Sequence, residues 1–169
     1  MFGEITLAAF ETEAILGSYL LRGELQSRGD LFAFLNDRNW NFVPIHHGEV
    51  FPLSENRKFG AMKRSLTMVN KNHLESVSIL KEEDAKQVRL SIYQRPILFI
   101  LDRFVVQGDL HVSEDAPDVD VLDELHDFFP VTDVSIFPIQ SVATNPTERV
   151  PLLFISRPAV QLYRIQEAE

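Results

Sequence analysis

The densest group of possible metal ligands in the chain is His46-His47-Gly48-Glu49. Imidazole and carboxylate groups are the ligands that zinc prefers among nitrogen and oxygen donors. Adjacent residues of a strand point to opposite faces, so both histidines could not reach one ion from a regular strand. We therefore interpret this segment as a loop or strand end, and expect no metal there.

A second candidate is the acidic stretch that contains Asp115, Asp118, Asp120 and Asp123. Carboxylates are calcium ligands, but the spacing lacks the glycine and the terminal glutamate of an EF-hand loop. Acidic residues ahead of a helix also favour the positive end of its dipole, and this requires no ion. The sequence thus predicts neither a metal nor a cofactor.

Possible acid and base groups occur at Glu124 and His126-Asp127, and Ser113 and Ser156 supply hydroxyls. None of them stands in a recognised nucleophile or acid/base motif, and no glycine-rich phosphate loop is present. We expect a non-enzymatic protein. A hydrolase that uses His126 or His47 stays open as a third alternative.

Two charged loops of opposite sign are candidates for protein contacts. The segment 57–64 is basic, while the segment 114–123 is acidic. Opposite charges on two loops could join chains head to tail and give a ring or a filament. The predicted interaction residues are Arg57, Lys58, Lys63, Arg64, Asp115, Asp118 and Asp120.

Charge and composition restrict the class of protein. The formal net charge is −9, and residues 81–169 carry sixteen acidic against eight basic side chains. Nucleic-acid binding usually needs a basic face, so we disfavour it. No apolar run reaches the roughly 20 residues of a membrane span, and the N-terminus lacks a secretion-signal pattern. The absence of cysteine fits a reducing cytoplasm, where we expect the protein.

The chain contains the same pattern twice. Phe42-Val43-Pro44 with Phe51-Pro52 recurs as Phe128-Phe129-Pro130 with Phe137-Pro138, and residues 42–79 align with 128–165 without a gap. Matched spacing of phenylalanine and proline indicates an internal repeat. The residues that we assign to the core of the repeat are Gly23, Phe42, Pro44, Phe51, Pro52, Gly108, Phe128, Pro130, Phe137 and Pro138.

Each copy predicts strands around one short helix. Runs at 5–8 and 13–25, and again at 90–93 and 98–110, alternate as strands do. A glycine inside both, Gly23 and Gly108, indicates a bulge, a bend or a close backbone approach. Helices are expected at 30–37 and 120–127 behind a capping aspartate, followed by three strands.

We therefore expect a mainly β (α+β) protein of two barrel-like repeats, packed face to face about a pseudo-twofold axis, each with one short helix. The expected boundaries are 1–80 for the first repeat, 81–86 for the linker and 87–169 for the second repeat. About 80 residues give each copy a marginal core by itself, which favours packing against the other copy.

The run Leu31 to Asn36, Phe42-Val43-Pro44 and the closing Val69-Asn70-Lys71 resemble a family of uncharacterised bacterial domains of Sm-like, small bent-sheet type. The second copy keeps Phe129-Pro130-Val131-Thr132-Asp133, but has His126 in place of the helix asparagine. This resemblance implies a fold and no activity.

The function that we predict is a cytoplasmic interaction or assembly module, with a protein partner or another copy of the chain as its partner. The alternative is a small-molecule-binding β-barrel, whose pocket would lie between the copies near Trp40, Phe42 and Phe128.

Overall fold

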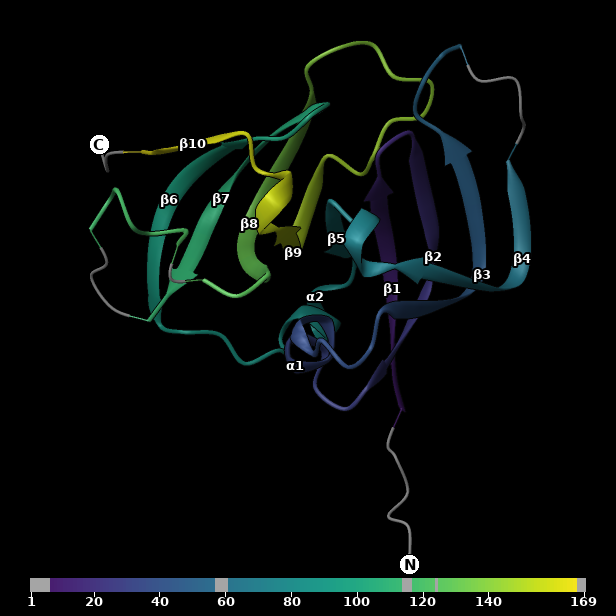
Figure 1. The fold of residues 1–169 in the computed structure, drawn as a ribbon, viewed down its shortest axis with the longest axis horizontal. Helices are drawn as coiled ribbons and strands as arrows, with labels where there is room; N and C mark the ends of the chain where they lie inside the picture. The colour runs from purple at the N-terminus through teal and green to yellow at the C-terminus, as the bar shows by residue number, and fades with distance from the viewer. Residues whose placement is uncertain (1–6, 57–60, 114–116, 124, 167–169) are drawn as a thin grey trace, which may run out of the picture.

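The computed structural model describes residues 7–56, 61–113, 117–123 and 125–166. Their ten strands form one open antiparallel sheet in the order β10-β6-β7-β8-β9-β5-β1-β2-β3-β4 (Figure 1). The strands of the first half are β1 Leu7–Leu16, β2 Tyr19–Arg28, β3 Phe42–Pro52, β4 Met62–Asn70 and β5 Ser76–Ile79. Those of the second half are β6 Tyr93–Ile100, β7 Phe104–Val112, β8 Phe128–Pro138, β9 Arg149–Ser156 and β10 Leu162–Ile165.

Short helical segments connect the strands. The α-helices are α1 Leu31–Asn36 and α2 Glu82–Ala85, and the 3-10 turns are η1 Lys71–His73 and η2 Arg157–Ala159. The side chain of Asp30 accepts a hydrogen bond from the Ala33 amide and so caps α1, as the sequence predicts. The expected linker contains α2.

Both halves have the same internal strand order. The first half runs β5-β1-β2-β3-β4 and the second runs β10-β6-β7-β8-β9. Individual backbone hydrogen bonds recur with an offset of 86 residues. The Lys71 amide donates to Asn41 O over 2.9 Å, and the Arg157 amide donates to Asp127 O over 2.8 Å. His47 and Asp133, again 86 apart, have left-handed φ values of 52° and 54°.

The halves join edge to edge in one continuous sheet. Strand β9 of the second half pairs with β5 of the first in an antiparallel register from Ser76–Ile155 to Ile79–Leu152. The fourth strand of one half therefore meets the fifth strand of the other, which is a head-to-tail contact. A twofold axis would instead pair equivalent strands.

The expectation of barrels packed face to face about a pseudo-twofold axis is therefore wrong. The sheet is open, and within each half the fourth and fifth strands do not pair. Strand β5, which could close the first half by pairing with β4, pairs instead with β9 of the second half.

Two element predictions also fail. The second helix, expected at 120–127, is a series of turns in the described residues 118–123. The expected strands at 13–25 and 98–110 are each broken by a hairpin turn, which in the first half is at Gly17-Ser18 with φ 49° at Gly17. Apolar runs flank both short turns, Gly17-Ser18 and Asp102-Arg103, and concealed them.

The prediction of an irregularity at Gly23 and Gly108 is confirmed. The register shifts between Arg22 and Glu24 and between Gln107 and Asp109. A Cβ atom at Gly108 would lie 2.6 Å from Val131 Cγ1 and 2.8 Å from the backbone oxygen of Thr132. These glycines permit the close strand approach at which the sheet bends.

The buried apolar side chains form two clusters that cross the junction between the halves. The cluster centred on the second half includes Ile15, Leu20 and Leu53 of the first half. The cluster centred on the first half includes Phe128 and Phe154 of the second. Each half thus completes the core of its neighbour. Within the described part of the chain, no helix is long and apolar enough to cross a membrane.

Candidate interaction surface

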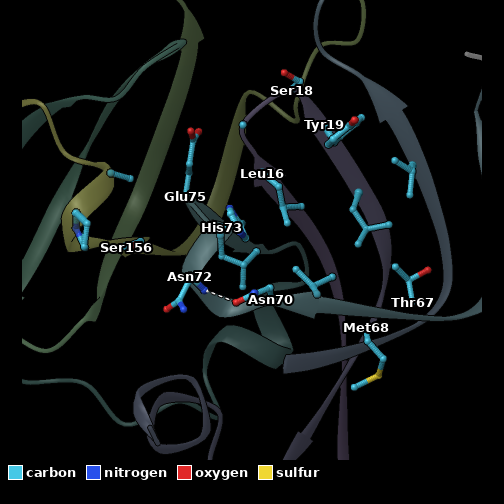
Figure 2. A pocket seen from close by; sticks show the side chains of 17 residues that line it. Leu16, Ser18, Tyr19, Thr67, Met68, Asn70, Asn72, His73, Glu75 and Ser156 are labelled. Atoms are coloured by element: carbon cyan, nitrogen blue, oxygen red, sulfur yellow. Dashed lines mark hydrogen bonds between the residues drawn. The ribbon is translucent and has the colours of Figure 1, made fainter. Parts of the chain in front are cut away.

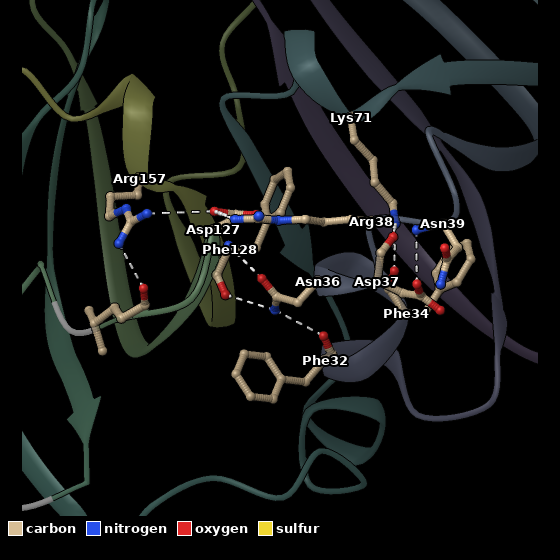
Figure 3. A network of polar contacts seen from close by, with 11 residues as sticks. Phe32, Phe34, Asn36, Asp37, Arg38, Asn39, Lys71, Asp127, Phe128 and Arg157 are labelled. Carbon is tan, nitrogen blue, oxygen red and sulfur yellow. Dashed lines mark hydrogen bonds and ion pairs between the residues drawn. The ribbon is translucent and has the colours of Figure 1, made fainter.

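Helix α1 fastens the first half to the second. The Asn36 amide donates from Nδ2 to Phe128 O over 3.0 Å, and its Oδ1 accepts from the Phe128 amide over 2.8 Å (Figure 3). The Phe32 ring stacks on Phe154 at 6.1 Å between centroids. One side chain therefore satisfies both backbone groups at the start of β8, while its helix covers β9.

In each half, a basic side chain donates hydrogen bonds to backbone oxygens of the segment that precedes the third strand. The ammonium of Lys71 donates to Phe34 O over 2.6 Å and to Asp37 O over 3.0 Å, at the carboxyl end of α1 (Figure 3). Burial lowers the pKa of Lys71, and the negative charge of Asp37 acts against this. Arg157, at the equivalent position, donates to Leu125 O over 2.9 Å.

A buried carboxylate fixes the long β8–β9 loop to the first half. Glu13 is 1% exposed and accepts from the Thr147 amide over 2.6 Å and from Arg22 Nε over 2.8 Å. Arg22 also donates to Asn145 O over 2.9 Å. Hydrogen bonds therefore join the two halves at Glu13 as well as at Asn36 of α1.

The two outer edges of the sheet, β4 and β10, lie at opposite ends of the ten strands (Figure 1). Leu66 and Met68 on β4 are 50% and 51% exposed. Their equivalents in β9, Leu152 and Phe154, are fully buried: β5 pairs with β9, α2 packs against β9, and the Phe32 ring of α1 stacks on Phe154. Edge strands normally carry charges or bulges against unwanted pairing, whereas the segment 66–69 carries neither.

An apolar depression adjoins this edge on one face of the sheet. It has a volume of about 630 Å³, and Trp40, Phe42, Leu66 and Met68 contribute to its lining. Phe42 is 47% exposed, whereas its equivalent Phe128 is buried. The guanidinium of Arg28 lies 3.9 Å from the centroid of the Trp40 ring.

A second cavity of about 600 Å³ opens on the other face, between the β1–β2 hairpin and β4 (Figure 2). Apolar side chains such as Leu16, Leu21 and Val69 contribute to its lining, and Glu75 lies at its border. The pKa of Glu75 is raised by burial and by Asp102, and is lowered less strongly by Arg103 and by a Gly17 backbone hydrogen bond. Among described residues, Glu75 Oε2 has no hydrogen-bond partner.

The charged residues predicted for interaction are scattered. Lys63 and Arg64 lie exposed on β4. Asp118 pairs with Arg95 of its own half, and Asp120 belongs to a turn. Arg57, Lys58 and Asp115 lie outside the described residues. The structure therefore places basic side chains on the open edge and acidic ones beside β6, and pairing between their loops stays a prediction.

The candidate metal and catalytic residues do not converge. His46 Nε2 lies 2.9 Å from Gln26 Oε1, and the His46 and His47 rings are 6.5 Å apart. The described residues contain no group of three or more side chains that could hold a metal ion. His126 packs edge-on against Phe32 at 5.1 Å between ring centroids. The hydrolase alternative with His126 or His47 stays a prediction.

The repeated phenylalanines and prolines occupy equivalent strands with unequal burial. Phe128 and Pro130 are buried, Phe42 and Phe137 are exposed, and Pro44 and Phe51 are half-buried. Pro52 and Pro138 end β3 and β8, whereas Pro44 and Pro130 lie inside these strands. Equivalent residues of β3 and β8 therefore differ in burial because different elements pack on the two strands.

The comparisons with known proteins give no relative: no family model, no curated protein and no solved structure matches this chain. The interaction surface therefore rests on its own geometry.

Sequence reasoning named Trp40 and Phe42, but it missed Leu66 and Met68 on the open edge and Asn36 and Lys71 at the junction of the halves. Leu66 and Met68 look like core positions, because their equivalents in the second copy are apolar too. Asn36 and Lys71 look like ordinary polar residues of a helix end and a turn. Only the pairing of β9 with β5 shows which copy is covered at these positions.

Proposed function

We propose that this chain is a non-enzymatic cytoplasmic assembly module whose open edge at β4 accepts a β-strand from a protein partner. The observation that carries the proposal is the exposure of Leu66 and Met68, whose equivalents in β9 are buried beside the paired strand β5 and under helical residues. Strand addition satisfies the free backbone groups of an edge, and side-chain pockets beside it give specificity.

The apolar surface beside the edge supports the same function. Trp40, Phe42, Leu66 and Met68 lie together on one face, and aromatic residues and methionine are enriched in protein interfaces. Contiguous exposed apolar surface of this kind marks interaction sites in soluble proteins.

Photo-crosslinking in cells that express the protein naturally tests the proposal. Benzoylphenylalanine in place of Met68 should give a covalent product with another polypeptide, and adding Leu66→Lys should remove that product. The same probe in place of Ile92, which is exposed but lies before β6, is the matched control. Absence of a product at position 68, or equal products at both positions, would contradict the proposal.

One observation also favours the small-molecule alternative. A cavity of about 400 Å³ lies between the halves, and Trp40, Lys71, Asp127 and Phe128 contribute to its lining. Phe42 belongs to the separate depression on β4. A metabolite that binds there must raise the thermal midpoint of the native protein, so a screen without any such shift would remove this alternative.

A further inference from the structure

We propose that the strand accepted by β4 is β10 of a second copy of this chain, in the register that β5 and β9 already show within one molecule. This inference rests on the proposed function and names its partner. The internal junction joins a fifth strand to a fourth strand, and the free edges of the molecule are again a fourth strand, β4, and a fifth strand, β10.

The offset of 86 residues converts the internal register into an intermolecular one. Ser76–Ile155, Val77–Phe154, Ser78–Leu153 and Ile79–Leu152 are paired within the chain. The equivalent pairs between two chains are Leu162–Val69, Tyr163–Met68, Arg164–Thr67 and Ile165–Leu66. These four pairs use all of β10 and the uncharged end of β4.

The cavity of Figure 2 has a filled counterpart in the second half. Its lining residues Leu16, Tyr19 and Leu21 correspond to Leu101, Phe104 and Val106, because the offset before β3 is 85 residues. Val50, Thr67 and Val69 correspond to Ile136, Leu153 and Ile155 at the offset of 86. All six of these second-half residues are buried in one cluster. The cavity is therefore the open version of a space that is closed elsewhere in the same molecule.

Three buried side chains of the first half belong to that closed cluster: Ile15, Leu20 and Leu53. Their equivalents in the second half are Ile100, Val105 and Ile139, at the turn beside β10. Ile139 is 47% exposed, whereas Leu53 is fully buried. In a second copy docked through β10, Ile100, Val105 and Ile139 meet the cavity of the first copy, as Ile15, Leu20 and Leu53 meet the second half.

A head-to-tail contact of this kind leaves β4 of one chain and β10 of the other free at the ends of every pair. Further copies can therefore add by the same contact, which gives a ring if the rotation closes and a filament if it does not. The contact between two chains differs from the internal junction in one respect. At the internal junction α1 packs on the second half, and α1 has no helical counterpart in the described residues of the second half.

Disulfide crosslinking between two purified single-cysteine variants tests the register. The sequence contains no cysteine, so Thr67→Cys introduces a single thiol at a half-buried position and Arg164→Cys a single thiol at an exposed one. Directly opposed residues of antiparallel strands have Cβ atoms about 4.5 to 5.5 Å apart, which is within reach of a disulfide after small shifts. The control mixture combines Thr67→Cys with Glu83→Cys, an exposed position on α2.

Mild oxidation of the Thr67→Cys and Arg164→Cys mixture should give a covalent product of two chains at about tenfold or more the yield of the control, because docking raises the effective thiol concentration. Equal yields, or no product, would overturn the inference. If no product forms while photo-crosslinking at position 68 captures a different protein, the proposed function stands and β4 accepts a strand of that protein instead of β10.

Discussion

At the scale of the residue, a few polar side chains determine how the halves meet. Asn36 binds both backbone groups of Phe128, and Glu13 holds the Thr147 amide in a buried position. Loss of such a partner leaves a buried donor or acceptor unsatisfied, which costs about 1 to 3 kcal/mol. Specific contacts therefore add to apolar burial in joining the two copies.

Asn36→Ala should lower the free energy of unfolding by about 2 kcal/mol, because the amide and carbonyl of Phe128 lose their partner. Urea denaturation of both proteins measures the difference. Asn39→Ala, which changes an exposed asparagine two residues beyond the α1 C-cap, is the control and should cost less than about 0.5 kcal/mol. Equal effects of both changes would show that α1 does not fasten the halves.

Glu75→Gln should stabilise the protein at neutral pH. A raised pKa means that the folded state takes up a proton more readily than the unfolded state, so the carboxylate costs stability above that pKa. The cost develops as pH rises from the ordinary value of 4.5 through the raised pKa, and it is absent below 4.5. Thermal midpoints of wild type and Glu75→Gln should therefore differ at pH 7 and converge near pH 4; a constant difference would contradict the assignment.

At the scale of the element, the glycine bulges of β2 and β7 determine the bend of each half. Repetition of Gly23 and Gly108 inside alternating apolar patterns was enough to predict an irregularity there. The hairpin turn at Gly17-Ser18 was not predictable by periodicity, since apolar residues flank it on both sides. The helix expected after Asp120 did not form in the described residues, although its pattern matched that of α1.

Gly108→Ala should lower the free energy of unfolding by about 3 kcal/mol, because the new methyl group would overlap Val131 and the Thr132 backbone. Gly29→Ala, where nothing lies within 4 Å of the added atom, should cost about 1 kcal/mol from its left-handed φ of 78° alone. Chemical denaturation compares the two. A smaller loss for Gly108→Ala than for Gly29→Ala would contradict the close approach at the bulge.

At the scale of the whole molecule, the repeat joins head to tail, and this was the least predictable feature. Apolar residues occur at equivalent positions of the two copies, which indicates a duplication. They do not show which edge strands of the two halves pair. Leu66 and Leu152 look alike in the sequence, and only one of them has a strand beside it. Burial at these positions depends on the neighbour of a strand, so only the sheet order reveals the exposed surface.

The apolar character of the β4 edge predicts how association responds to salt. In the proposed pairing of β4 with β10, Arg164 is the charged residue among the paired positions, so assembly should persist at 1 M salt, where the Debye length is about 3 Å. Contact through the basic and acidic loops would instead be lost. Light scattering at two ionic strengths separates these two modes of association.

Sedimentation of the purified chain across a concentration series tests the head-to-tail assembly most directly. The account predicts species heavier than the 19.4 kDa chain that grow with concentration. Met68→Lys should return them to the mass of one chain, whereas Ile92→Lys, at an exposed apolar position outside the edge, should not. A wild-type protein that remains at 19.4 kDa up to about 100 µM, where even a weak specific contact is populated, would contradict it.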